Sequence, residues 1–297
     1  MLKFNWKSWL AIGPALAVLA AITLEAGAAT LPDGARLLAD QAYGNTPRQR
    51  MDVVLPQQAT HGADAPVLVM VHGGAWMVGN KSASGVADNK IMRWVGQGFI
   101  FVSVNYRLWP EADPLTQAHD VALALTTVQA KARGWGGDPA RVLLMGHSAG
   151  AHLVALLGAA PALAREEGAQ PWLATVALDS AALDLPSLMA RPHMRFYDRV
   201  FGSDPAFWAS ASPLQRLGSN ATPMLLVCST QRRDQSCAQA QRFAEQAHTS
   251  GRRAELLPQD LSHAQINAQL GLPGAYTDAV EKFMASVDPV LARRLGR

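Results

Sequence analysis

The feature that most restricts the fold of this chain is a series of short apolar runs separated by longer helical patterns. Continuous apolar runs of this kind are typical of strands covered on both faces of a parallel sheet. The runs are PVLVMV at 66–71, FIFVSV at 99–104, VLLM at 142–145, LATVAL at 173–178, MLLV at 224–227 and a weaker AELL at 254–257. Residues 43–55 add a turn and a strand with alternating polar and apolar residues.

Helical patterns fill several of the intervals between these runs, at residues 115–132, 149–159 and 235–248. Helices that connect parallel strands cover both faces of the sheet. The sequence therefore predicts an α/β fold with a mostly parallel sheet. Residues 184–216 are an exception, because they are rich in Met, Phe, Tyr and Trp and show no strand periodicity. We expect this long insertion to form a lid over the sheet edge.

The first thirty residues differ in character from the rest of the chain. Lys3 and Lys7 precede an apolar stretch, Trp9 to Leu24, and Ala28 ends a small-residue signal of the A-x-A type. This layout is typical of a secretory signal peptide. An uncleaved membrane anchor is the alternative, but the stretch is short for a membrane span and Pro14 interrupts it.

Cleavage of residues 1–28 would leave residues 29–297 as a single domain, periplasmic or secreted, without stable membrane insertion. Disulfides persist in such compartments, and the chain has only two cysteines, Cys228 and Cys237. We expect these cysteines to be bridged. Two buried free thiols are the alternative, because a cysteine count gives no geometry.

Composition argues against several classes of function. Charged residues make up only 16% of the chain, the formal net charge is +3, and Lys and Arg are scattered, so nucleic acid is not an expected partner. The sequence contains no CxxC pair or Cys/His cluster, so no metal site is expected.

The pentapeptide GHSAG at 146–150 follows one apolar run and precedes an Ala-rich helical pattern. A serine in such a strand-to-helix turn is held in strained backbone geometry, and the flanking glycines let strand and helix pack closely. Its hydroxyl then points outward at the head of the sheet. The pattern predicts that Ser148 is a nucleophile.

A second glycine motif, HGGAW at 72–76, follows the run at 66–71. Glycine lets the main chain approach an oxyanion closely, so Gly73 and Gly74 are expected to donate backbone N–H groups. The N–H of Ala149, directly after the serine, would be the other arm of this oxyanion hole.

The motifs HGGAW, GHSAGAHL and SHAQIN, in this order, resemble the α/β-hydrolase superfamily, and most closely its carboxylesterase and arylformamidase-like branch. The similarity extends from about Tyr43 to near Phe283 and includes NYRL at 105–108 and ASPL at 211–214. The resemblance implies an eight-stranded, mostly parallel sheet and a Ser/Asp/His triad. HGGAW departs from the HGGG of hormone-sensitive-lipase-like esterases, so that subgroup's substrates are not expected.

The general base of such enzymes follows the nucleophile and the acid in the chain. Of the eight histidines, His263 fits best, because it lies just past the apolar run at 254–257. His147 and His152 flank the serine in the sequence. His147 occupies the variable position of the GHSAG motif, and His152 lies in the helical segment that follows it. We expect both to be structural.

The acid that orients the imidazole should follow the run at 224–227, where Asp234 is the only nearby carboxylate. Asp234 would accept a hydrogen bond from Nδ1 of the imidazole. It could also simply cap the helix that begins there. Asp179, at the end of the preceding run, is the alternative acid.

The predicted mechanism is carboxylic ester hydrolysis of a small-molecule substrate without a cofactor. The serine attacks the acyl carbon, the histidine transfers the proton to the leaving group, and water releases the acid. The same residues could serve an amidase, arylformamidase or peptidase, and an inactive hydrolase fold used for binding is a further alternative. Residues expected to shape the substrate pocket, or else to cover the core, are Trp76, Met189, Met194, Phe196, Tyr197, Phe207 and Trp208.

Overall fold

The computed structural model describes residues 31–57 and 64–297. The expected signal peptide, residues 1–28, lies outside this part of the chain. Among the described helices, none has both the length and the apolar composition needed to cross a membrane.

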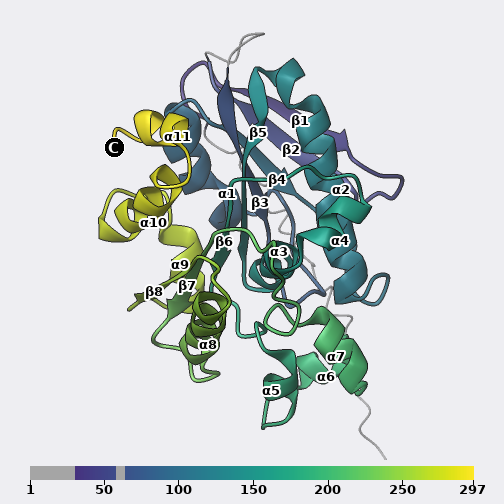
Figure 1. Ribbon diagram of the computed structural model, residues 1–297. Coiled ribbons are helices and arrows are strands. Elements are labelled where there is room, and N and C mark those ends of the chain that lie inside the picture. Colours follow the sequence, from purple (N-terminus) through teal and green to yellow (C-terminus); the bar gives the residue numbers. More distant parts are fainter. Residues whose placement is uncertain (1–30, 58–63) are drawn as a thin grey trace, which may run out of the picture.

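An eight-stranded sheet, with strand order β1-β2-β4-β3-β5-β6-β7-β8, forms the centre of the molecule (Figure 1). Its strands are β1 (Arg36–Ala42), β2 (Arg50–Leu55), β3 (Ala65–Val71), β4 (Ile100–Val104), β5 (Gly137–His147), β6 (Ala174–Leu178), β7 (Met224–Ser229) and β8 (Ala254–Gln259). Only the β1–β2 and β2–β4 pairs are antiparallel. The prediction of a mostly parallel eight-stranded sheet is confirmed, although β1 itself was not among the predicted strands.

Helices cover both faces of the sheet (Figure 1). They are α1 (Ser84–Lys90), the π-helical turn η1 (Ile91–Val95), α2 (Pro114–Ala132), the 3₁₀ turn η2 (Arg133–Trp135), α3 (Ala149–Ala159), α4 (Pro161–Glu166), α8 (Ser236–Thr249), α9 (His263–Gln269), α10 (Ala275–Ala285) and α11 (Pro289–Arg294). Successive strand residues point to opposite faces. Val69 of β3 therefore packs in the cluster with α2 and α3, and Met70 in the cluster with η1, α9 and α10.

The insertion at 184–216 forms three short helices, α5 (Leu185–Met189), α6 (Arg195–Phe201) and α7 (Pro205–Ala211). Asp184 and Asp204 cap α5 and α7 by accepting from backbone N–H groups, and a proline occupies the first turn of each helix. These helices lie together at one end of the molecule, below α3 in the view of Figure 1. The aromatic side chains of α6 pack against Trp76, which follows β3.

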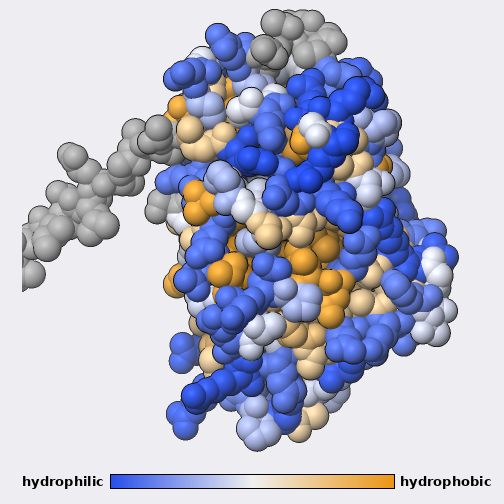
Figure 2. Space-filling view, turned by 90° about the vertical axis from the view of Figure 1, so that its left-hand side faces the viewer, coloured by the Kyte–Doolittle hydropathy of each residue, from blue (hydrophilic) through white to orange (hydrophobic). Residues whose placement is uncertain are grey.

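The side of the molecule that carries α8, α10, α11 and the edge strand β8 faces the viewer in Figure 2. Hydrophilic residues cover most of this side, and apolar residues gather near its middle. Pro258 lies in β8, where the missing N–H is tolerated because an edge strand has only one neighbour.

Candidate active site

Ser148 occupies a sharp turn between β5 and α3. Its backbone has φ 57° and ψ −116°, outside the regions that most residues adopt. The glycines on either side leave no room for a side chain: a Cβ on Gly150 would lie 2.3 Å from the carbonyl oxygen of Val71, and one on Gly146 would lie 2.4 Å from that of Gly150. The motif therefore holds the serine by close packing of β3, β5 and α3.

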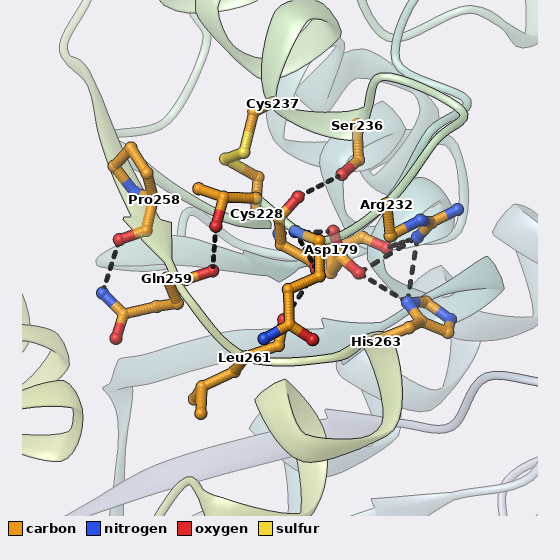
Figure 3. The surroundings of a disulfide bond; sticks show 12 residues. Asp179, Cys228, Arg232, Ser236, Cys237, Pro258, Gln259, Leu261 and His263 are labelled. Atoms are coloured by element: carbon orange, nitrogen blue, oxygen red, sulfur yellow. Dashed lines mark hydrogen bonds and ion pairs between the residues drawn. A yellow bond between two sulfur atoms is a disulfide. The ribbon is translucent and has the colours of Figure 1, made fainter.

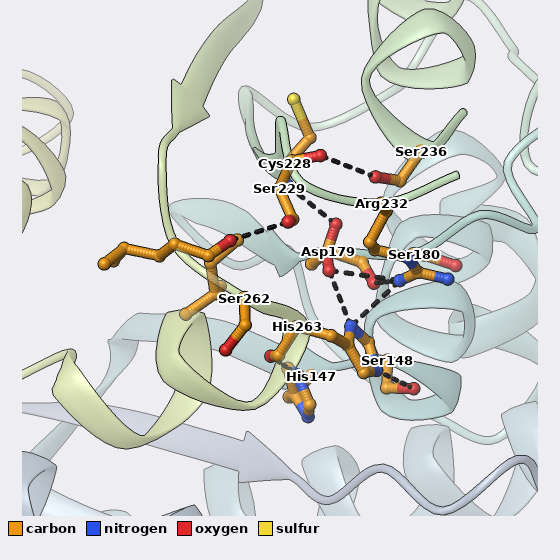
Figure 4. Close-up of polar contacts among 12 residues, drawn as sticks. His147, Ser148, Asp179, Ser180, Cys228, Ser229, Arg232, Ser236, Ser262 and His263 are labelled. Atoms are coloured by element: carbon orange, nitrogen blue, oxygen red, sulfur yellow. Dashed lines mark hydrogen bonds and ion pairs between the residues drawn. The ribbon is translucent and has the colours of Figure 1, made fainter. Parts of the chain in front are cut away.

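His263 lies within hydrogen-bond distance of Ser148 on one side and of Asp179 on the other (Figure 4). Its Nε2 is 2.9 Å from Oγ of Ser148, and its Nδ1 is 2.6 Å from Oδ2 of Asp179. A carboxylate only accepts, so Nδ1–H donates to Asp179 and Nε2 accepts from the serine hydroxyl. His263 begins α9 directly after a capping box at Ser262, which fixes the start of that helix.

Asp179 follows β6 and has no exposed surface. It accepts hydrogen bonds from the backbone N–H of Ser229, at 2.9 Å, and from the Arg232 guanidinium, at 3.1 Å. Burial raises the pKa of Asp179, but the hydrogen bond from His263, the charge of Arg232 and the Ser229 N–H outweigh it. Together they hold the pKa of this carboxyl far below its usual range.

Asp234, the acid expected from the sequence, does not contact His263. Its carboxylate pairs with the Arg232 guanidinium, which donates from Nε at 2.8 Å. Arg232 lies between the two acids and bonds to both of them. The structure therefore brings Asp179, the alternative, to the imidazole, because the β7–α8 loop turns Asp234 outward onto the arginine.

Arg232 is the residue at this site that the sequence interpretation missed. Its NH1 group donates to the carbonyl oxygen of Asp179 at 2.8 Å and lies 2.9 Å from Nδ1 of His263. Because the proton on Nδ1 is directed at Asp179, this approach places a positive charge beside the ring rather than adding a hydrogen bond. The only signal in the sequence was an Arg-Arg-Asp run in the loop after a predicted strand.

A disulfide joins Cys228, in β7, to Cys237, in the first turn of α8 (Figure 3). The two cysteines are nine residues apart, and the segment that they close carries Ser229 and Arg232. Both of these residues donate hydrogen bonds to Asp179. The bridge expected from the sequence is therefore adjacent to the acid of the site.

Glycines 73 and 74 follow β3, and Gly73 lies against the serine. A Cβ on Gly73 would be 2.8 Å from Cβ of Ser148, and Gly74 has φ 122°, which favours glycine. Both residues line one cavity together with Ala149, at the N-terminus of α3. Backbone N–H groups in the first turn of a helix lack partners within the helix. The arrangement can therefore supply donors beside Oγ of Ser148.

The two histidines that flank Ser148 in the sequence have structural contacts. Nε2 of His147 lies 2.9 Å from the carbonyl oxygen of His263, and burial lowers the pKa of His147 to about 3. His152 accepts from the Trp76 indole at 3.2 Å, and its Nε2 lies 2.8 Å from the carbonyl oxygen of Ala211 in α7. Burial lowers the pKa of His152 to about 4, so both rings are neutral near pH 7.

A cavity of about 560 Å³ opens above Ser148 and His263. Four of the expected pocket residues line it, namely Trp76, Met194, Phe196 and Tyr197. Met189 instead packs in the core, and Trp208 donates from its indole to the carbonyl oxygen of Phe201. Within residues 31–57 and 64–297, no group of three His, Cys, Asp or Glu side chains is arranged to hold a metal ion.

Solved structures of esterases share this architecture. Esterase B from Lactobacillus rhamnosis superposes with a TM-score of 0.69 at 18% identity and covers 89% of each chain. The apo form of Thermogutta terrifontis esterase 2 gives a TM-score of 0.67 at 21% identity over 88% of this chain and 95% of that chain. The expected α/β-hydrolase fold is confirmed.

Curated relatives are also named as esterases. Esterase LipC of Mycobacterium tuberculosis is 29% identical to this chain, over 62% of this chain and 48% of its own length. The probable carboxylic ester hydrolase LipM of the same organism is 35% identical, over 41% of this chain and 28% of its own length. The chain spans about half the length of these relatives or less. The BD-FAE family model matches residues 51–246, which is more than half of the 297 residues. This chain therefore belongs to the BD-FAE family.

Proposed function

We propose that this protein hydrolyses carboxylic esters through an acyl-enzyme on Ser148, with His263 as the general base and Asp179 as the acid that orients it. The observation that carries the proposal is the continuous line of contacts from Ser148 through His263 to the buried Asp179. Esterase names among the sequence relatives support the same reaction class.

In the first half of the proposed reaction, Oγ of Ser148 attacks the carbonyl carbon while Nε2 of His263 removes the hydroxyl proton. Asp179 stabilises the imidazolium that forms and stays ionised itself. The backbone N–H groups of Gly73, Gly74 and Ala149 bind the tetrahedral oxyanion. His263 then gives its proton to the departing alcohol oxygen, and the acyl group remains on the serine.

In the second half, a water molecule replaces the alcohol. His263 takes a proton from the water as the water attacks the acyl carbon, and the proton returns to Oγ of Ser148 when the acid is released. Every proton that leaves one oxygen is taken up by another, so the reaction needs no cofactor. The aromatic wall of the cavity suits an apolar portion of the ester.

An ester panel tests this function. Turnover of p-nitrophenyl esters of increasing chain length is measured beside formanilide and peptide substrates, for the wild type and for Ser148→Ala. We expect ester cleavage that exceeds amide cleavage and falls by several orders of magnitude in the variant, with unchanged melting. Ester turnover that survives the substitution would refute the proposal.

Export is a further part of the proposal. The disulfide between Cys228 and Cys237 supports an oxidising compartment, because thiols are kept reduced in the cytosol. The charged and apolar start of the chain supports a cleaved signal. The intact mass of protein recovered from the periplasm or medium of a secreting host should correspond to cleavage near Ala28, and recovery of full-length protein in the cytoplasm would contradict it.

A further inference from the structure

A second cavity, of about 790 Å³, opens beside the first. The two cavities share Met194, Tyr197, Arg232 and His263 in their walls. Ser148 and the glycines that follow β3 line only the first cavity. The second cavity therefore meets the site from the side of the imidazole.

Positive charge dominates the wall of this second cavity. Arg191, Arg232 and Arg233 line it, and Asp234 is the acid that lines it with them. Arg232 is already held between Asp234 and the buried Asp179. Even when both aspartates are counted, the three arginines leave an excess of positive charge.

Two of these arginines are available to a ligand. Arg191 donates from NH1 to the amide oxygen of Gln235 at 2.6 Å and from NH2 to the carbonyl oxygen of Asp234 at 3.2 Å, which are both neutral acceptors. Arg233 is exposed. In the part of the chain that the structure describes, neither arginine pairs with a carboxylate.

The chemistry of the site decides which part of an ester would enter this cavity. In the proposed reaction His263 protonates the leaving oxygen, so the alcohol portion lies next to the imidazole. His263 lines both cavities, and the second one extends from the imidazole away from Ser148 and the glycines that would bind the oxyanion. The alcohol portion of the substrate would therefore extend toward Arg191 and Arg233.

We propose that this enzyme prefers esters whose alcohol portion carries a carboxylate, and that Arg191 and Arg233 determine the preference by binding that carboxylate. A guanidinium presents two parallel N–H donors that match the two oxygens of a carboxylate. The inference rests on the proposed ester hydrolysis and names the substrate class for the same site.

Matched substrates test the inference. Acetate esters of ω-hydroxyalkanoic acids are compared with the corresponding ω-hydroxyalkanamides, over chains of about four to eight carbons, so that only the distant charge differs. We expect kcat/KM to favour the carboxylate about tenfold at one chain length, and the preference to shrink at high salt. Equal kcat/KM for carboxylate and amide at every length would overturn the inference.

Variants assign the preference to the cavity. Arg191→Gln and Arg233→Gln should each lower the carboxylate-to-amide ratio severalfold, and the double variant should bring it close to one. Arg216→Gln is the matched control, because Arg216 is exposed and lines neither cavity. A control that lowers the ratio as much as the cavity variants would show a general charge effect and refute the assignment.

Two further measurements separate this inference from the proposed function. Monoesters of dicarboxylic acids carry the carboxylate on the acyl side. If substitution of Arg191 and Arg233 lowers kcat/KM for these monoesters more than for the acetate esters of ω-hydroxyalkanoic acids, the placement of the alcohol portion is contradicted. Calorimetric binding of the free ω-hydroxyalkanoate needs no turnover and should weaken in the two variants. If neither the charged nor the neutral esters are cleaved, the proposed function fails, whereas cleavage without a charge preference contradicts only the inference.

Discussion

Asp179 is buried and accepts a hydrogen bond from Nδ1 of His263, and in the proposed reaction it orients this ring. An amide in its place would offer an N–H group toward Nδ1 and favour the wrong tautomer of the imidazole. Asp179→Asn should therefore reduce kcat by up to about 10⁴-fold, while a fluorophosphonate still labels Ser148 at a reduced rate. Steady-state kinetics on a p-nitrophenyl ester and labelling rates provide the two measurements.

Asp234→Asn is the matched control for this substitution. Asp234 pairs with Arg232 and does not reach the imidazole, so the loss of its charge should lower turnover by less than about tenfold. The assignment of the acid is wrong if Asp234→Asn reproduces the large loss of turnover and Asp179→Asn does not.

At the scale of elements, close contact between β3 and α3 holds the serine turn. A Cβ at Gly150 would lie 2.3 Å from a main-chain oxygen of β3, and backbone atoms cannot rotate away as a side chain can. We expect Gly150→Ala to lower the free energy of unfolding by about 3 kcal/mol. In Gly134→Ala the added methyl group meets nothing within 4 Å, so this control should melt within a few degrees of the wild type.

Thermal or urea unfolding of the two glycine variants checks this expectation. If Gly150→Ala lowers the free energy of unfolding no more than Gly134→Ala does, the turn accommodates the added methyl group, and the packing described for it is contradicted.

The disulfide restrains the connection between β7 and α8. The two cysteines are nine residues apart. In the chain-entropy model, removing the bridge with the double substitution Cys228→Ala and Cys237→Ala should lower the free energy of unfolding by about 2 to 3 kcal/mol. Urea unfolding measures this cost, and thiol titration of unreduced, denatured wild-type protein should find no free thiol. Two titratable thiols would refute the bridge.

Sequence patterns predicted the elements that are regular and buried. Every predicted apolar run became a strand, because continuous apolar residues have to be covered on both faces. Strand β1 escaped prediction because most of its residues are exposed, and it pairs with β2 alone at the sheet edge. The insertion's three helices are each too short to show helical periodicity over several turns.

For the candidate site, the part that could be expected from the sequence is the geometry of the two glycine motifs. The serine turn and the glycines after β3 contact each other directly, so two short motifs contain both sides of this contact. The choice between Asp179 and Asp234 depends on how the loop after β7 turns, which involves Arg232 and contacts between distant parts of the chain. The sequence order of strands and acids does not contain that information.

At the scale of the whole molecule, buried histidines make stability depend on pH. Burial lowers the pKa of His72 to about 4, that of His147 to about 3 and that of His152 to about 4. An unfolded histidine has a pKa of about 6.5, so below that pH the unfolded chain binds more protons than the native protein. The free energy of unfolding should therefore fall as the pH drops from about 6.5 toward 4.

The carboxyl of Asp179 acts in the same direction at lower pH. Its pKa is lowered in the folded protein, so the stability that it contributes is present above the unfolded pKa of about 3.9 and is lost as the pH falls further. Urea unfolding midpoints at pH 7.5, 5.5 and 4.5 should decrease in that order. Midpoints that stay constant across this range would contradict the burial of neutral histidines.

The central claim, that Ser148 is the nucleophile of this molecule, is tested most directly by mapping where a fluorophosphonate reacts. Peptide mass spectrometry of the labelled wild type should find a single adduct, on the peptide that contains Ser148, and none in a folded Ser148→Ala variant. An adduct at another residue, or one that persists in the variant, would contradict the account.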